Sequence, residues 1–176
     1  MKNFVYALVA IFALVSCDKL DELTKFDIEY KSNVTIPSTV GIDVPFDVST
    51  PDVETNSESK FEVNDTRKDL IEEIRLKELV LTITSPDEAD FSFLESIVIY
   101  ISAEGLDEIK IAEEVEVDSN TGNSLDVDVV DVDLKEYIKK DEFKLHLETV
   151  TDEVISRDHE IEVNSTFFVD AKILGL

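Results

Sequence analysis

Residues 161–170 read Ile-Glu-Val-Asn-Ser-Thr-Phe-Phe-Val-Asp, and this stretch decides the fold class. Positions 161, 163, 167 and 169 are apolar, whereas positions 162, 164, 166 and 170 are polar. Successive side chains of a β-strand point to opposite faces, so this two-residue period predicts a strand with one buried and one exposed face. Such a strand needs partners, and the rest of the chain supplies them.

The same period recurs along the chain, beginning with Phe26-Asp27-Ile28-Glu29-Tyr30-Lys31. Residues 97–101 differ, because Ile-Val-Ile-Tyr-Ile is uninterrupted and predicts a central strand covered on both faces. Pro45 places its strand at an edge or a bulge. Besides 161–170, the predicted strands cover residues 26–36, 40–48, 61–63, 79–84, 96–102, 109–117, 125–132 and 143–149.

Two short helices are predicted between these strands. The first covers residues 64–73, with Asn64 or Asp65 as its cap and Leu70, Ile71 and Ile74 as its apolar face. The second covers residues 135–139, capped by Asp131 or Asp133.

These elements predict an all-β protein, an antiparallel two-sheet β-sandwich with immunoglobulin-like architecture and one or two short helices. The connections are too short for repeated βαβ crossovers. Residues 25–176 form a single β-sandwich domain in this interpretation. Residues 69–83 echo residues 133–147 at an offset of 64, which indicates either an internal duplication or one local solution used twice.

The composition and net charge of the chain limit the classes of partner and cofactor that we expect. The formal net charge is −25, with 16 Lys and Arg against 41 Asp and Glu. A field of this sign repels nucleic acid and anionic lipid, so we expect no nucleic-acid partner and no binding of the acidic surface to anionic lipid. The four glycines form no phosphate-binding loop, and we expect no cofactor.

The N-terminus carries the clearest motif. Lys2 precedes an uncharged apolar run from Phe4 to Val15, and Ser16 stands directly before Cys17, the single cysteine. The run is about half the ~20 residues that a membrane-spanning helix needs, which is typical of a cleaved signal peptide. Leu14-Val15-Ser16-Cys17 resembles the lipobox of bacterial lipoproteins. The resemblance implies that residues 1–16 are removed and that Cys17 carries acyl chains that hold the protein in a membrane.

Residues 17–24 follow as a short charged tether. A lysine followed by acidic residues resembles the export signal of some gram-negative surface lipoproteins, whereas Asp18 directly after the cysteine resembles an inner-membrane retention signal. We therefore expect an exported, lipid-anchored protein of the outer membrane, at its periplasmic or cell-surface face, with the inner membrane as the alternative.

Three features are candidates for chemistry. His146 and His159 are the two histidines, and we expect both to be solvated rather than catalytic, because no nucleophile elbow or metal-binding spacing accompanies them. Residues 126–133 carry Asp126 and Asp128 on one predicted strand face and, with Asp118, are a candidate Ca²⁺ site that lacks the EF-hand pattern. Residues 91–94 read Phe-Ser-Phe-Leu, which fits a core plug better than a partner surface.

The sequence thus predicts a non-catalytic, lipid-anchored interaction or structural module of the cell envelope, with an envelope protein as its possible partner. One alternative is a binding protein for a small apolar or sugar ligand, which needs a cavity. The other is an enzyme with an unrecognised site.

Overall fold

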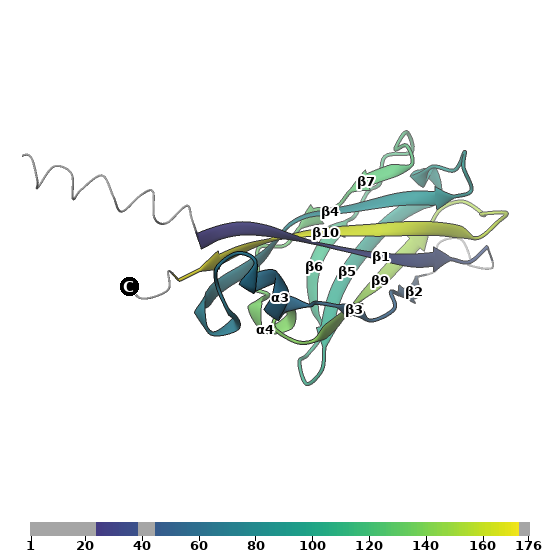
Figure 1. Ribbon diagram of the computed structural model, residues 1–176. Helices are drawn as coiled ribbons and strands as arrows, with labels where there is room; N and C mark the ends of the chain where they lie inside the picture. Colours follow the sequence, from purple (N-terminus) through teal and green to yellow (C-terminus); the bar gives the residue numbers. More distant parts are fainter. Residues whose placement is uncertain (1–23, 39–44, 173–176) are drawn as a thin grey trace, which may run out of the picture.

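The protein is a sandwich of two antiparallel sheets (Figure 1). A computed structural model describes residues 24–38 and 45–172. One sheet has the strand order β1-β10-β4-β7, and the other has the order β2-β9-β5-β6-β8, with β3 also paired to β9. The strands are β1 (Lys25–Ile36), β2 (Phe46–Ser49), β3 (Val53–Glu54), β4 (Ile71–Ser85), β5 (Leu94–Ala103), β6 (Ile109–Glu114), β7 (Ser124–Asp126), β8 (Asp128–Val129), β9 (Glu142–Thr151) and β10 (His159–Ala171). The predicted all-β sandwich is confirmed.

Strand β10 lies in the middle of its sheet, as its strict alternation requires. It pairs along its whole length with β1, from Lys25 opposite Asp170 to Ile36 opposite His159. On its other side it pairs with β4. Phe167 and Val169 are fully buried between the sheets.

Strand β5 is central in the second sheet, between β9 and β6, as predicted. The prediction that both of its faces are covered is wrong. Ile99 and Ile101 are fully buried, whereas Val98 and Tyr100 are only half-buried on the outer face. A two-layer sandwich covers only the inner face of each sheet. The apolar residues on the outer face of β5 are therefore shielded from water only in part, by side chains of the neighbouring strands.

Aromatic rings join the two sheets through the core. The Tyr30 ring of β1 lies 5.3 Å from the Phe143 ring of β9 and 5.7 Å from the Phe167 ring of β10, both edge to face. The Phe143 and Phe167 rings are 6.0 Å apart. Such pairs fill the interior with large side chains in favourable geometry.

The first predicted helix is misplaced. The helical segments here are α3 (Ser57–Glu62) and the 3₁₀ turn η2 (Lys68–Leu70), while Ile71 and Ile74 belong to β4. Phe61, predicted to begin a strand, is fully buried in α3. Ile74 stands opposite Val169 of β10, so long-range pairing with a central strand outweighs local helix preference.

The second predicted helix is confirmed as α4 (Lys135–Ile138). The side chain of Asp133, rather than that of Asp131, accepts hydrogen bonds from the backbone N–H groups of Lys135 and Ile74. The two echoing segments differ in structure, because Ile74 lies in a strand and its counterpart Ile138 lies in a helix. This difference favours a local resemblance over a duplication.

Other predicted strands change in extent. Residues 125–132 do not form one strand, because the chain leaves the first sheet after β7 and joins the second at β8. Buried Val127 marks the crossing. Of the predicted strand 40–48, residues 39–44 lie outside the described part, and β2 begins at Phe46. The predicted strand 109–117 ends at Glu114 as β6.

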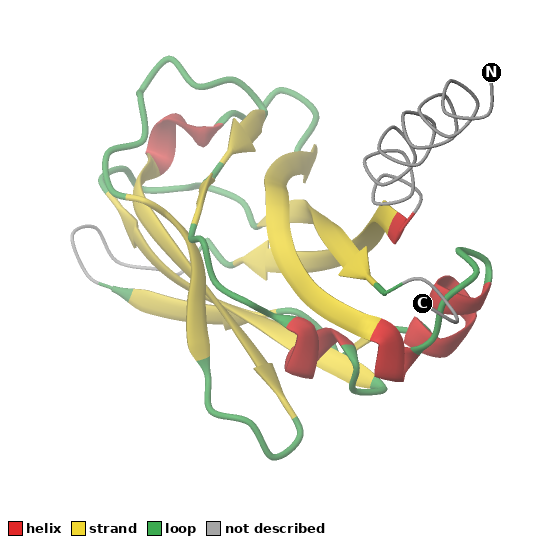
Figure 2. Cartoon of the chain, turned by 90° about the vertical axis from the view of Figure 1, so that its left-hand side faces the viewer, coloured by secondary structure: helices red, strands yellow, loops and turns green. Residues whose placement is uncertain are grey.

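The sandwich has two different ends. The helical end consists of residues 57–70, 133–142 and 172, which surround the start of β1 and the end of β10 (Figure 1). Figure 2 looks toward this end, with helical segments in the foreground. The loop end consists of residues 86–93, 115–123 and 152–158, which lie at the opposite ends of β1 and β10. None of the helices in the described residues combines the length and apolar composition that crossing a bilayer requires.

Candidate functional site

Cys17, the predicted lipidation site, lies outside the described residues. The structure shows where the chain leaves that segment. Lys25 begins β1 at the helical end, beside Asp170 near the end of β10. An anchor at Cys17 therefore connects to the helical end through residues 18–24.

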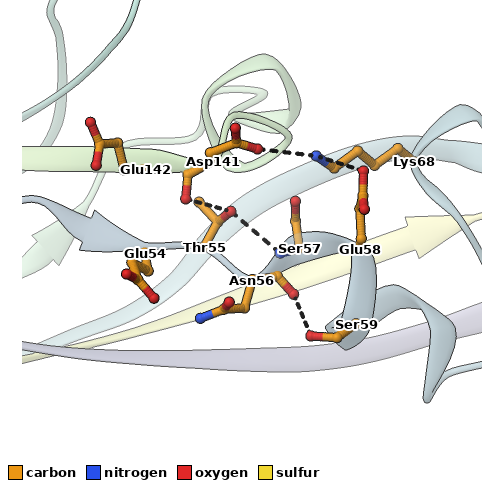
Figure 3. A pocket seen from close by; sticks show the side chains of 9 residues that line it. All are labelled: Glu54, Thr55, Asn56, Ser57, Glu58, Ser59, Lys68, Asp141 and Glu142. Atoms are coloured by element: carbon orange, nitrogen blue, oxygen red, sulfur yellow. Dashed lines mark hydrogen bonds and ion pairs between the residues drawn. The ribbon is translucent and has the colours of Figure 1, made fainter.

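A polar pocket of about 500 Å³ lies at the helical end, between β3, α3, η2 and the start of β9 (Figure 3). The chain after β3 is fastened to β9, because Thr55 N–H donates to the carbonyl of Asp141 at 2.8 Å. Asn56 then adopts the left-handed conformation at φ 45° and starts α3. Asparagine tolerates that conformation better than most residues. The pocket is lined by Glu54, Thr55, Asn56, Ser57, Glu58, Ser59, Lys68, Asp141 and Glu142.

Charge dominates this pocket. Four carboxylates line it together with one ammonium group, that of Lys68. Lys68 Nζ lies 3.6 Å from Glu58 Oε1 and 3.8 Å from Asp141 Oδ1, so it bridges the two walls through loose ion pairs (Figure 3). The Ser57 hydroxyl is buried beneath them and has no hydrogen-bond partner among the described residues.

The lining of the pocket contains neither histidine nor cysteine. It offers carboxylate and hydroxyl oxygens to a polar or cationic group. The sequence prediction missed it, because residues 51–59 read as a turn. The available signal was Asn56 before Ser57 and Glu58, a favourable N-cap followed by an acidic first turn.

His146 lies on the outer face of the second sheet and is less exposed than predicted. Its Nδ1 is 3.1 Å from Glu108 Oε1, and its Nε2 is 3.4 Å from Asp47 Oδ1. The ring stacks on Tyr100 with centroids 5.7 Å apart. Partial burial acts to lower the pKa of His146, but the hydrogen bonds and charges of Glu108 and Asp47 outweigh it and raise the pKa above its ordinary value.

This arrangement is a clasp, by which we mean that the His146 ring links Asp47 and Glu108 through its two nitrogens. A neutral imidazole donates one hydrogen bond, so the imidazolium is the form that satisfies both carboxylates. Asp47 comes from β2 and Glu108 from the turn between β5 and β6. Protonated His146 thereby joins three parts of the second sheet.

The prediction that His159 is solvated is wrong. Its side chain is 8% exposed, and its ring centroid lies 4.7 Å from that of Phe93. Nδ1 lies 2.9 Å from the carbonyl oxygen of Arg157, which gives the buried ring a hydrogen-bond partner. This packing was not predictable from local sequence patterns, because Phe93 lies far from His159 along the chain.

The segment around Phe91 is the predicted core plug. Phe91, Phe93 and Leu94 are 0–4% exposed, and the 3₁₀ turn η3 (Phe91–Phe93) closes the loop end of the core. Asp90 fixes the turn by accepting from the Ser92 N–H, and hydrogen bonding to Ser92 lowers the pKa of Asp90.

Asp126 and Asp128 line one surface pocket, but the candidate Ca²⁺ ligands do not form the predicted site among the described residues. Asp126 lies in the first sheet and Asp128 in the second, so they do not share a strand face as predicted. Asp118 is occupied in its own turn, where Oδ1 accepts from the N–H of Asn120. Within residues 24–38 and 45–172, no three acidic or histidine side chains are placed to hold a metal ion.

Comparison with known proteins gives no relative. No protein-family model matches the chain, and no curated protein sequence matches it. A structure of turnip yellow mosaic virus aligns with 86% of this chain and 98% of its own at 10% identity, with a TM-score of 0.27. A structure of desmodium yellow mottle tymovirus aligns with 86% of this chain and 85% of its own at 12% identity and TM-score 0.29. A crystal structure of FlhE aligns with 83% of this chain and 98% of its own at 8% identity and TM-score 0.27. Likenesses this weak assign no function.

Proposed function

We propose that this protein is a lipid-anchored, non-catalytic interaction or structural module of the bacterial cell envelope. The proposal rests on the lipobox-like Leu14-Val15-Ser16-Cys17 and on the apolar core that packs between the two sheets. The ring cluster of Tyr30, Phe143 and Phe167 occupies the space between the sheets. This single observation favours a module that acts through its surface.

A carrier of a small apolar ligand needs an apolar cavity, typically about 300–1,000 Å³. The pocket at the helical end has the volume but is lined by carboxylates, hydroxyls and one ammonium group. A polar ligand such as a sugar therefore suits this pocket better than an apolar one.

The anchor is tested by metabolic labelling of the full chain in a bacterial host with an alkyne-bearing fatty acid. We expect the wild type and Ser16→Ala to be labelled, because alanine keeps the residue before the cysteine small. Cys17→Ser is expected to lose the label, because no thiol remains to accept a lipid. Labelling of Cys17→Ser, or an unlabelled wild type, contradicts the proposal.

A further inference from the structure

The charges of the domain are distributed unevenly between its two ends. The helical end carries eight acidic and seven basic residues, a net charge of −1. The loop end carries eight acidic residues and Arg157 as its one basic residue, a net charge of −7. The helical end thus holds seven of the 14 basic residues in the described part of the chain but only eight of its 37 acidic residues.

The sides of the sandwich are also acidic. The described residues that belong to neither end comprise 21 acidic and six basic residues, a net charge of −15. A surface rich in anionic lipid repels such faces over about one Debye length, ~8–10 Å at physiological salt. The helical end is repelled least.

The position of the proposed anchor along the chain also places the helical end nearest the membrane. Residues 17–24 span at most roughly 25 Å when fully extended. Strand β1 places its far end roughly 35 Å further on, given its 12 residues. The anchor can therefore hold the helical end at a lipid surface. The loop end reaches that surface only if the whole domain tilts until one of its acidic sides lies against the membrane.

From these two observations we infer that the helical end rests against the lipid headgroups and that the acidic loop end points away from the membrane. The occupant of the helical end is thus the lipid surface itself. This inference rests on the lipid anchor proposed above. It leaves the loop end as the surface that is free to meet another envelope component.

Two exposed valines provide a matched pair of probe positions. Val63 at the helical end is 80% exposed and Val154 at the loop end is 70% exposed, so a cysteine at either site disturbs little packing. Cys17 is the sole native cysteine, and its thiol is blocked in the acylated protein, so each introduced thiol is the one that reacts. A fluorophore on Val63→Cys or Val154→Cys then reports the distance of that end from lipid.

The experiment uses full-length lipidated protein in vesicles of phosphatidylethanolamine and phosphatidylglycerol that contain a headgroup-nitroxide lipid. We expect the fluorophore at position 63 to lose most of its emission and the one at position 154 to lose little. Equal quenching, or stronger quenching at 154, on protein that floats with the vesicles overturns the orientation alone. Protein that fails to float with the vesicles overturns the anchor, and the orientation with it.

Discussion

At the scale of single residues, His146 links protonation to stability. Its folded pKa is raised by Glu108 and Asp47, so protonated His146 stabilises the fold fully below the unfolded value of about 6.5. This contribution is lost as pH rises through the folded pKa. We expect the stability difference between wild type and His146→Gln to grow by roughly 0.5 kcal/mol as pH falls from about 8 to about 6, the size of a partly exposed ion pair.

Urea unfolding at several pH values measures this difference, and NMR titration of the imidazole reports the pKa directly. Asp47→Asn with Glu108→Gln is the matched control, because it keeps the shapes and removes the charges. In that variant, the pKa of His146 is expected to fall. A histidine that titrates at or below its ordinary pKa in the wild type argues against the clasp.

The partners of His146 also show why a site is hard to predict from sequence. Its place on the polar face of β9 followed from the alternation of Phe143, Leu145 and Leu147. Glu108 and Asp47 come from a turn and from an edge strand far along the chain. Only pairing of the strands brings them to the ring, and no local pattern records that pairing.

At the scale of elements, α4 depends on Asp133. The carboxylate accepts from the N–H groups of Lys135 at 3.0 Å and Ile74 at 3.2 Å, and so fastens the helix to β4. Burial acts to raise its pKa, but these hydrogen bonds outweigh burial and lower it. Its contribution is present above the unfolded pKa of about 3.9 and is lost as pH falls through the folded pKa.

We expect Asp133→Ala to cost about 1–2 kcal/mol at neutral pH, because the N–H groups of Lys135 and Ile74 lose their charged acceptor. Asp131→Ala is the matched control, because Asp131 is 76% exposed and pairs with Arg75 at the surface. Its effect is expected within about 0.5 kcal/mol. Chemical denaturation of both variants measures the free energy of unfolding. Equal losses of stability in the two variants would show that Asp133 has no special role.

Secondary-structure elements were predictable where one face of a strand is buried and the other is exposed, because the sequence then alternates. β1, β9 and β10 alternate over most of their length, and each forms a strand where the period predicted one, whereas in β4 this holds only for residues 79–84. The region of α3 was not predictable in this way. Its six residues are too few to hold a helix by themselves, and Phe61 is buried partly against Phe26, with ring centroids 6.4 Å apart. The helix is therefore fixed by a contact with β1 rather than by its own sequence.

At the scale of the whole molecule, the net charge predicted the character of the surface but not its distribution. A net charge of −25 predicts a surface that repels nucleic acid. The near-neutral helical end appears only when residues 57–70, 133–142 and 172 are seen at one end of the fold. Sheet topology therefore supplied what composition could not.

The pairing of β1 with β10 also sets the time at which this domain can fold. β10 lies between β1 and β4, so the first sheet cannot form completely before β10 has left the ribosome. Such long-range pairing is slow to form. We expect a chain truncated after residue 158 to be digested rapidly by protease, whereas a chain truncated after residue 172 resists. Resistance of the shorter chain would show that β10 is dispensable. A polypeptide built in this order stays unfolded until β10 has been synthesised, which would suit the passage across a membrane that the proposed export requires.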